Sequence, residues 1–324
     1  LGPHRLVCGD SLDPLVVAAL MDGEKAEMVF TDPPYNVAIE GNVSGLGKIR
    51  HREFAMASGE MTRDQFTSFL SSAFANLAPH SSDGSIHFVC MDWRHMGEML
   101  EAGAANYSEL KNLIVWVKDN GGMGSFYRSR HELIFAFKNG SLPHINSFEL
   151  GQHGRYRTNV WQYRGVNTLK AGRLDELAMH PTVKPVAMIV DAIKDVSRRG
   201  GVVLDLFGGS GSTLIAAHKT GRRARLCEFD PVYCDRILQR WEVFAKDDAE
   251  LVACGLSGRP ANDQRVGNRA IEEQVSEGAF GNIPISAKRK PGVRAGDGDV
   301  AAGAHSTSHG GSLDSPRLGR TGSL

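Results

Sequence analysis

The residues best suited to chemistry form a short run, Asp32–Tyr35, directly after the apolar residues Met28–Phe30. The acid can accept hydrogen bonds from an amino group. The two prolines fix φ and carry no N–H, which leaves their carbonyl groups available. The aromatic ring offers a flat face on which a base can stack. The run therefore suits a site that holds a planar amine, although alone it is also typical of a polar turn after a strand.

A second run, Leu204–Thr213, contains a glycine-rich turn between a predicted strand and a predicted helix. Glycines there allow a sharp turn and the close approach of a ligand. Glu228 ends the next predicted strand, at the spacing at which a carboxylate meets ribose hydroxyls in doubly wound nucleotide sites. Asp205 would repel a pyrophosphate and attract a cation, and Leu214 replaces the third glycine of the dinucleotide fingerprint. The pattern favours a cationic nucleoside such as S-adenosylmethionine over NAD.

The elements that must position these runs alternate along the chain. Short β-branched or aromatic segments alternate with amphipathic ones, which is the pattern of a mainly parallel sheet covered by helices. The predicted strands are Arg5–Cys8, Met28–Thr31, Ser85–Cys90, Leu113–Lys118, Leu133–Lys138, Val202–Phe207 and Arg225–Phe229. The predicted helices are Pro14–Met21, Arg63–Leu77, Trp93–Gly103, Pro185–Ser197, Ser212–Thr220 and Pro231–Phe244. Thr62 and Gln65 have the spacing of a capping box.

Composition narrows the class of protein. A chain of 324 residues with 41% hydrophobic content can bury the core of one large domain or two ordinary ones. The formal net charge is zero, so a nucleic-acid partner would have to meet a local basic patch. The absence of a long apolar stretch or a C-x-x-C pair favours a reducing, cytoplasmic protein without a membrane span or structural zinc. Because the chain opens on Leu1, we expect a fragment or a processed product.

Taken together, the motifs resemble those of the DNA amino-methyltransferases, which methylate adenine N6 or cytosine N4. The resemblance covers nearly all of residues 1–255 and includes a third run, His180–Pro185, between the other two. The target motif precedes the cofactor motif, an order that is typical of the β group of this family. The resemblance implies an α/β, doubly wound, mostly parallel, seven-stranded Rossmann-like S-adenosylmethionine-dependent methyltransferase fold. It also implies an antiparallel last strand and circular permutation.

The resemblance divides the candidate residues into two halves of one site. Asp32, Pro33, Pro34 and Tyr35 would hold the target amine of a base flipped out of the duplex. The expected cofactor residues, which include the acid of the Gly9–Ser11 segment, are Asp10, Thr182, Lys184, Asp205, Phe207, Gly208, Gly209, Gly211, Thr213 and Glu228. Two further segments, Trp116–Lys118 and Tyr127–Glu132, are similar to family segments and fit a strand and a polar loop equally well.

Contact with DNA is expected from residues 152–173, which contain basic and aromatic side chains and no acids. The candidate DNA-binding residues are Arg155, Arg157, Trp161, Arg164, Lys170 and Arg173. The alternative is a solvated loop with a hydrophobic anchor. The resemblance places a target-recognition region here, within residues 139–179, and a glycine-rich loop at 38–61 can also take part. Residues 256–324 have a low-complexity composition that predicts a largely disordered tail.

These observations predict a DNA adenine-N6 methyltransferase, because an acid at the position of Asp32 favours adenine within the family and serine is commoner for cytosine N4. The alternatives are a cytosine-N4 enzyme, a methyltransferase of RNA or protein, and a silent DNA-binding homologue. The expected cofactor is S-adenosylmethionine, and the expected partner is DNA in a bacterial or phage-type cytoplasm. No metal or membrane is expected, and a homodimer stays open.

Overall fold

The computed structural model describes residues 1–37, 57–122, 126–165 and 183–252. They belong to one compact unit, Leu1–Ala253. The sequence expectations for Thr182, Lys170, Arg173 and the tail at 256–324 lie outside the described residues, as do most of the loop at 38–61 and the second half of the predicted recognition region.

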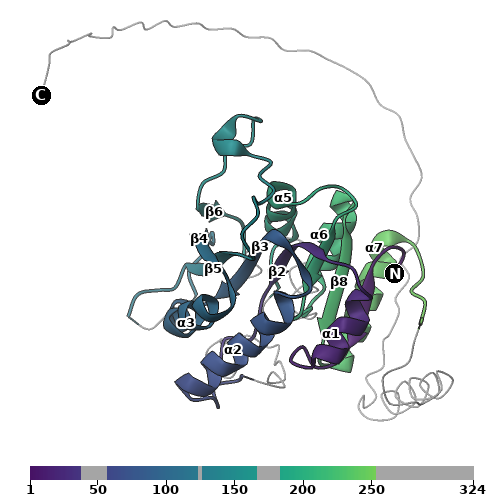
Figure 1. Cartoon of the computed structure of the whole chain (residues 1–324), viewed down its shortest axis with the longest axis horizontal. Coiled ribbons are helices and arrows are strands. Elements are labelled where there is room, and N and C mark those ends of the chain that lie inside the picture. Colours follow the sequence, from purple (N-terminus) through teal and green to yellow (C-terminus); the bar gives the residue numbers. More distant parts are fainter. Residues whose placement is uncertain (38–56, 123–125, 166–182, 253–324) are drawn as a thin grey trace, which may run out of the picture. The chain divides into compact units, whose positions relative to one another are not determined.

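Eight strands of the described residues form one sheet in the order β1-β8-β7-β2-β3-β5-β4-β6 (Figure 1). They are β1 (Arg5–Cys8), β2 (Ala26–Thr31), β3 (Ser81–Met91), β4 (Glu109–Val117), β5 (His131–Lys138), β6 (Val160–Gln162), β7 (Val202–Asp205) and β8 (Arg223–Glu228). The strand β5 runs antiparallel to β3 and β4, and the other pairings are parallel.

The sheet differs from the expected one in two respects. It has an eighth strand, the edge strand β6, whose three residues are too few to show an alternating pattern. The antiparallel strand is the fifth along the chain rather than the last. It follows β4 through a hairpin, and strands joined in this way run antiparallel.

The helices agree closely with the sequence pattern. They are α1 (Pro14–Met21), α2 (Arg63–Leu77), α3 (Met96–Asn106), α5 (Val186–Val196), α6 (Ser212–Thr220) and α7 (Pro231–Ala245), with short 3₁₀ turns at Trp93–His95 and Glu149–Gly151. The capping box of Thr62 and Gln65 is confirmed at the start of α2. The segment predicted as one helix from Trp93 begins instead as a 3₁₀ turn, which the Asp92 carboxylate caps by accepting a hydrogen bond from the Arg94 N–H.

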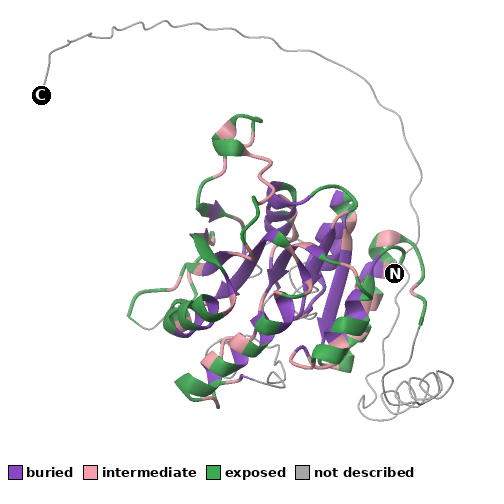
Figure 2. Ribbon diagram, viewed as in Figure 1, coloured by how far each residue is buried: buried purple, intermediate pink, exposed green. Residues whose placement is uncertain are grey.

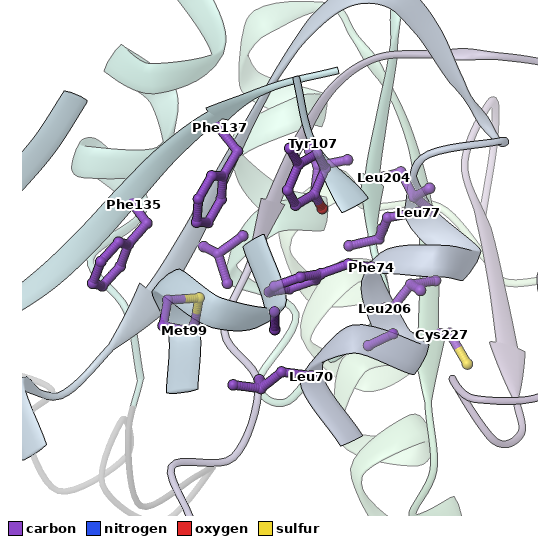
Figure 3. Packing of buried hydrophobic residues seen from close by; sticks show 14 of the residues in the cluster. Leu70, Phe74, Leu77, Met99, Tyr107, Phe135, Phe137, Leu204, Leu206 and Cys227 are labelled. Atoms are coloured by element: carbon purple, nitrogen blue, oxygen red, sulfur yellow. The ribbon is translucent and has the colours of Figure 1, made fainter. Parts of the chain in front are cut away.

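The sheet lies between two hydrophobic cores, so its strands are buried in Figure 2. Residues of α1, α2 and α3 form one core, and residues of α5, α6 and α7 form the other. Within β2, Val29 belongs to the first core, whereas Met28 and Phe30 belong to the second, as the alternation of a strand requires. Figure 3 shows the first core, where Phe74 packs near the stacked rings of Tyr107 and Phe137. Because helices cover both faces of the sheet, a ligand can reach it only at its edges.

Candidate active site

The two chemical motifs meet at the carboxyl edge of the sheet. The parallel strands β2 and β7 are neighbours, and they end at Thr31 and Asp205. The chain continues from β2 to β3 on one side and from β7 to β8 on the other, so the strand order reverses between them. Such a reversal is the place where doubly wound sheets bind ligands. The Thr31 hydroxyl donates a 2.8 Å hydrogen bond to Asp205 Oδ1, which joins the two motifs directly.

Asp32 lies in a charged cluster with Tyr35, Glu132, Lys184 and Lys118. Lys184 Nζ lies 2.6 Å from Asp32 Oδ2 and 3.1 Å from Glu132 Oε2, and only 5% of the Lys184 side chain is exposed. The Tyr35 hydroxyl lies 2.7 Å from Asp32 Oδ1 and 3.1 Å from Glu132 Oε2. Lys118 pairs with the other oxygen of Glu132. Two carboxylates therefore face two ammonium groups, and the formal charges of the cluster balance.

The surroundings shift the pKa values of Asp32 and Glu132 in opposite directions. Burial raises the pKa of Asp32 above its ordinary value, and Lys184 opposes part of this rise. Burial also acts on Glu132, but Lys184 and Lys118 together lower its pKa to about 2. The pKa of Lys184 lies above its ordinary value, because its two carboxylate partners outweigh burial. Glu132 is thus the permanent anion of the cluster, and Asp32 is the better proton acceptor.

Lys184 and Tyr35 lie in positions that the sequence pattern did not predict. The resemblance assigns Lys184 to the cofactor, whereas the structure directs its ammonium group to Asp32 and Glu132. The same group lies 5.2 Å from the centre of the Tyr35 ring, on the aromatic face. The Tyr35 hydroxyl is bound within the cluster, and burial raises its pKa well above the ordinary value. Tyr35 therefore anchors Asp32 in addition to offering a ring face.

The glycine turn packs tightly between β7 and α7. The Gly208 N–H donates a 2.8 Å hydrogen bond to the Cys227 carbonyl. A Cβ at Gly208 would lie 3.2 Å from Ile237 Cδ1 and 3.3 Å from that carbonyl oxygen. Gly211 has φ +75° and caps the start of α6. A side chain at Gly208 would crowd these neighbours, and the positive φ of Gly211 favours glycine. The turn therefore presents its backbone at the carboxyl edge, as a nucleoside-binding loop must.

Two acids lie beside this turn at the ends of β8 and β1. Glu228 Oε2 accepts a 2.7 Å hydrogen bond from the Gly209 N–H, and its Oε1 accepts one of 2.9 Å from the Asp230 N–H. Asp10 follows β1, where the Gly9 N–H donates a 2.9 Å hydrogen bond to the Glu228 carbonyl. A carboxylate oxygen accepts two hydrogen bonds, so Glu228 keeps capacity for ribose hydroxyls. The expected cofactor residues that the structure describes, Lys184 excepted, thus gather at the ends of β1, β8 and β7 and at the start of α6.

Asp205 gives the turn its preference for a cation. It is buried, and burial raises its pKa to about 7, although the Thr213 hydroxyl, the Phe207 N–H and the Thr31 hydroxyl all donate to it. A carboxyl group that is costly to ionise gains stability from a nearby positive charge. The residues therefore fit S-adenosylmethionine, whose sulfonium and ammonium groups are cationic.

Replacement of Asp205 by asparagine has a predicted dependence on pH. A raised pKa in the folded state gives stability that is present below the ordinary value of 3.8 and is lost as the pH rises through about 7. At pH 8 we expect Asp205→Asn to unfold with a free energy about 1–3 kcal/mol higher than the unliganded wild type. We expect its affinity for S-adenosylmethionine to fall about 10- to 100-fold, because a contact to a charged group is lost. Urea unfolding and calorimetric titration at pH 6 and 8 test this; equal affinities of the two proteins at pH 8 would contradict it.

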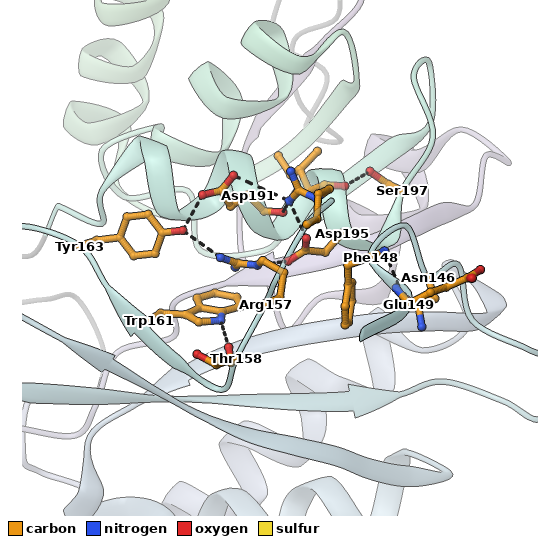
Figure 4. A network of polar contacts seen from close by, with 12 residues as sticks. Asn146, Phe148, Glu149, Arg157, Thr158, Trp161, Tyr163, Asp191, Asp195 and Ser197 are labelled. Atoms are coloured by element: carbon orange, nitrogen blue, oxygen red, sulfur yellow. Dashed lines mark hydrogen bonds and ion pairs between the residues drawn. The ribbon is translucent and has the colours of Figure 1, made fainter. Parts of the chain in front are cut away.

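The candidate DNA-binding side chains divide into paired and exposed groups. Arg155 and Arg157 lie 2.6 Å and 2.8 Å from the two carboxylate oxygens of Asp195, a buried residue of α5. Figure 4 shows Arg157 between this acid and the hydroxyl of Tyr163, which donates to Asp191. These contacts fasten the segment to α5. They give the two arginines a structural role.

Trp161 and Arg164 complete the described part of this segment. Trp161 is buried, and the Arg157 guanidinium lies 4.7 Å from the centre of its ring. Its indole N–H donates a 2.9 Å hydrogen bond to the Thr158 carbonyl. Arg164 is exposed. Arg164 is thus the one exposed residue among the expected DNA-binding residues that the structure describes.

Glu132 and Lys118 are site residues that the sequence pattern did not assign. Both belong to segments that resemble the family, yet nothing in their spacing connects them to Asp32. The signal that was available is a single acid at the start of an apolar strand, in the run Arg130–Glu132. An acid in this position would be costly to bury unless a cation met it.

Comparison with known proteins places the chain in a family. The model of the DNA methylase family N6_N4_Mtase matches residues 26–239. The chain belongs to this DNA methylase family. It is 24% identical over 297 residues to DNA adenine methyltransferase YhdJ of Escherichia coli (strain K12), which covers 84% of this chain and 92% of that protein. It is 26% identical over 230 residues to type II methyltransferase M.HpaI of Haemophilus parainfluenzae, covering 64% and 65% of the two chains.

Solved structures of methyltransferases share the fold of this DNA methylase. The PvuII DNA methyltransferase, cytosine-N4-specific, has a TM-score of 0.57 at 14% identity and covers 83% of this chain and 93% of its own. The M1.HpyAVI–SAM complex has a TM-score of 0.50 at 16% identity and covers 73% and 98%. The chain is thus an S-adenosylmethionine-dependent DNA methyltransferase of the N6/N4 type.

Two features are absent from the described residues. None of the helices there combines the length and apolar character needed to cross a bilayer. In the same residues, no group of three or more histidine, cysteine or acidic side chains has the geometry to hold a metal ion.

Proposed function

We propose that this DNA methylase transfers the methyl group to the exocyclic N6 amine of adenine at a specific DNA site. The observation that carries the proposal is the acid Asp32, which its charged cluster orients at the carboxyl edge beside the cofactor turn. Within the family, an acid at this position favours adenine. The likeness to an adenine methyltransferase over most of both chains also supports adenine.

The chemistry begins with the amine. Its lone pair is delocalised into the ring, so it is a poor nucleophile until its two hydrogens are held. Asp32 and the Pro33 carbonyl accept these hydrogens, which directs the nitrogen lone pair at the incoming methyl group. Each oxygen of Asp32 holds one hydrogen bond within the cluster and can accept a second. S-adenosylmethionine supplies an electrophilic methyl group on a sulfonium centre.

Positive charge develops on the amine nitrogen as the methyl group arrives. Asp32 stabilises this charge and is the nearest proton acceptor, with a pKa that burial raises. Lys184 and Tyr35 fix the orientation of Asp32, while Glu132 keeps Lys184 charged and in place. The base reaches the site only by leaving the duplex stack. The flipped base stacks on the ring of Tyr35. Pro34 shapes the turn that holds these residues.

The second candidate is methylation of cytosine N4. It rests on the chemistry of the site, because the likeness to a cytosine-N4 enzyme at 14% identity bears on the fold alone. Both bases present an exocyclic amine with two hydrogens, so the same contacts serve either. RNA or protein methylation has less support, because an asparagine is typical at the position of Asp32 in those enzymes and their cofactor motif usually precedes the target motif. A silent homologue has less support because the Asp32 cluster and the glycine turn are both intact.

Nucleoside analysis tests the choice of base. The protein is incubated with labelled S-adenosylmethionine and unmethylated genomic DNA, and the DNA is digested to nucleosides. We expect the label in N6-methyldeoxyadenosine. Label in N4-methyldeoxycytidine alone would overturn the assignment of adenine and leave the amine chemistry intact.

A further inference from the structure

The hairpin that joins β4 to β5 leaves the sheet at the edge where the site lies. β3 runs parallel to β2, and Leu133 at the start of β5 pairs with Met91 at the end of β3. Val117, the last residue of β4, pairs with His131. The hairpin therefore emerges at the carboxyl edge, and in Figure 1 it projects away from the sheet.

Both roots of the hairpin belong to the charged cluster. Lys118 follows β4 and pairs with Glu132, which in turn contacts Lys184 and the Tyr35 hydroxyl. Backbone hydrogen bonds hold the arms together beyond this point: the Lys118 N–H donates to Arg130 at 2.9 Å, and the Gly122 N–H donates to Ser129 at 2.7 Å. Four residues lie between Tyr127 and Glu132, so Tyr127 lies within about 17 Å of the cluster along the chain.

The outer part of the hairpin carries two adjacent aromatic rings in solvent. Phe126 is 86% exposed and Tyr127 is 81% exposed, and their ring centres lie 4.5 Å apart in an edge-to-face arrangement. Arg128, the next residue, is exposed. A scattered apolar residue on a surface needs no explanation, but two neighbouring large rings beside a basic group indicate a binding surface.

We propose that Phe126 and Tyr127 insert into the base stack of the DNA duplex beside the target nucleotide, and that Arg128 contacts the adjoining phosphate. The inference rests on the proposed function, which requires the target base to leave the stack. Aromatic and apolar wedges stabilise unstacked steps in other architectures by replacing the lost contacts. The hairpin brings such a wedge to the rim of the site, and a positive charge beside it matches the phosphate backbone.

The test compares two double variants with a matched control. Phe126→Ser/Tyr127→Ser removes both rings, and Phe126→Trp/Tyr127→Phe keeps two aromatic rings. The control, Leu142→Ser/Val243→Ser, removes two apolar side chains that are 57% and 78% exposed and lie away from the carboxyl edge. Transfer of label to native and to heat-denatured genomic fragments is measured for each protein, together with the affinity for S-adenosylmethionine.

For the serine variant we expect kcat/KM on native DNA to fall about 10- to 100-fold, the effect of losing a stacked base–aromatic contact. Its cofactor affinity and its transfer to denatured DNA should stay within about twofold of wild type, since neither requires a base to be extruded from a duplex. The aromatic variant and the control should retain transfer to native DNA.

Three outcomes would contradict the insertion of Phe126 and Tyr127 into the base stack. They are unchanged transfer to native DNA by the serine variant, an equal loss on native and denatured DNA, and a loss in the aromatic variant as large as in the serine variant. Failure of the proposed function is seen separately, because the wild type would then place its label in N4-methyldeoxycytidine or would label neither form of DNA.

Discussion

Replacement of Asp32 by alanine is expected to lower the rate of methyl transfer to DNA by at least about 10²–10³-fold, which is the cost of removing one positioned group that stabilises developing charge. The variant loses the acceptor of one amine hydrogen and the nearest acceptor of the proton. Affinity for S-adenosylmethionine should change little, because the glycine turn, Asp205 and Glu228 are untouched. The Tyr35 hydroxyl and Lys184 keep Glu132 as a partner, so the fold should survive.

Single-turnover transfer and calorimetric titration of the cofactor separate the two effects. Asp22→Ala is the matched control, since Asp22 forms an exposed ion pair with Arg5 and should leave transfer unchanged. Loss of cofactor binding together with transfer in Asp32→Ala would mean that Asp32 belongs to the cofactor half of the site.

Replacement of Lys184 by methionine is expected to lower the free energy of unfolding by about 3–5 kcal/mol, because it removes the shared cation of two carboxylates that are only 20% and 15% exposed. Lys118 still meets Glu132, whereas Asp32 loses its cation entirely. The double variant Lys184→Met/Asp32→Asn removes the acid that is left without a cation and should recover a large part of the loss.

The dependence on pH follows from the direction of the pKa shifts. The pKa of Glu132 falls from 4.5 to about 2, so its contribution to stability is present above pH 4.5 and is lost as the pH falls towards 2. The pKa of Lys184 lies above 10.5, so its contribution is present below that pH and is lost as the pH rises beyond it. Lys184 also opposes the rise in the pKa of Asp32, so its removal raises that pKa further. In urea unfolding we therefore expect the difference between wild type and Lys184→Met to increase as the pH rises above about 5 and Asp32 ionises in the variant. A difference below about 1 kcal/mol, the value of an exposed pair, would contradict the buried cluster.

Local patterns predicted the elements well because their causes are local. The bounds of α1, α2 and α6 were predicted from apolar periodicity and capping residues, and β1 was predicted in full. The edge strand β6 was not predicted, since it depends on pairing with Val115–Val117 far along the chain. The resemblance implied that Asp32 and the glycine turn belong to one site, and the Thr31–Asp205 hydrogen bond joins the two segments.

Local sequence patterns could not predict ion pairs between residues that are far apart in the sequence. Arg155 and Arg157 suggest a phosphate-binding run when read alone, yet Asp195 on α5 takes both. Lys184 suggests a cofactor contact, yet it lies between Asp32 and Glu132. In each case the acidic partner is brought near only by the tertiary fold. Because an unpaired buried charge is costly, the basic side chain pairs with that acid.

Transfer of label to competing acceptors tests the central claim most directly. Unmethylated genomic DNA, total RNA and total protein are offered together with labelled S-adenosylmethionine to the wild type and to Asp32→Ala, and the label in each acceptor is counted after separation. We predict label in DNA with the wild type and background in all three acceptors with Asp32→Ala. Label in RNA or protein with none in DNA, or undiminished label in DNA with Asp32→Ala, would contradict a DNA amine held by Asp32.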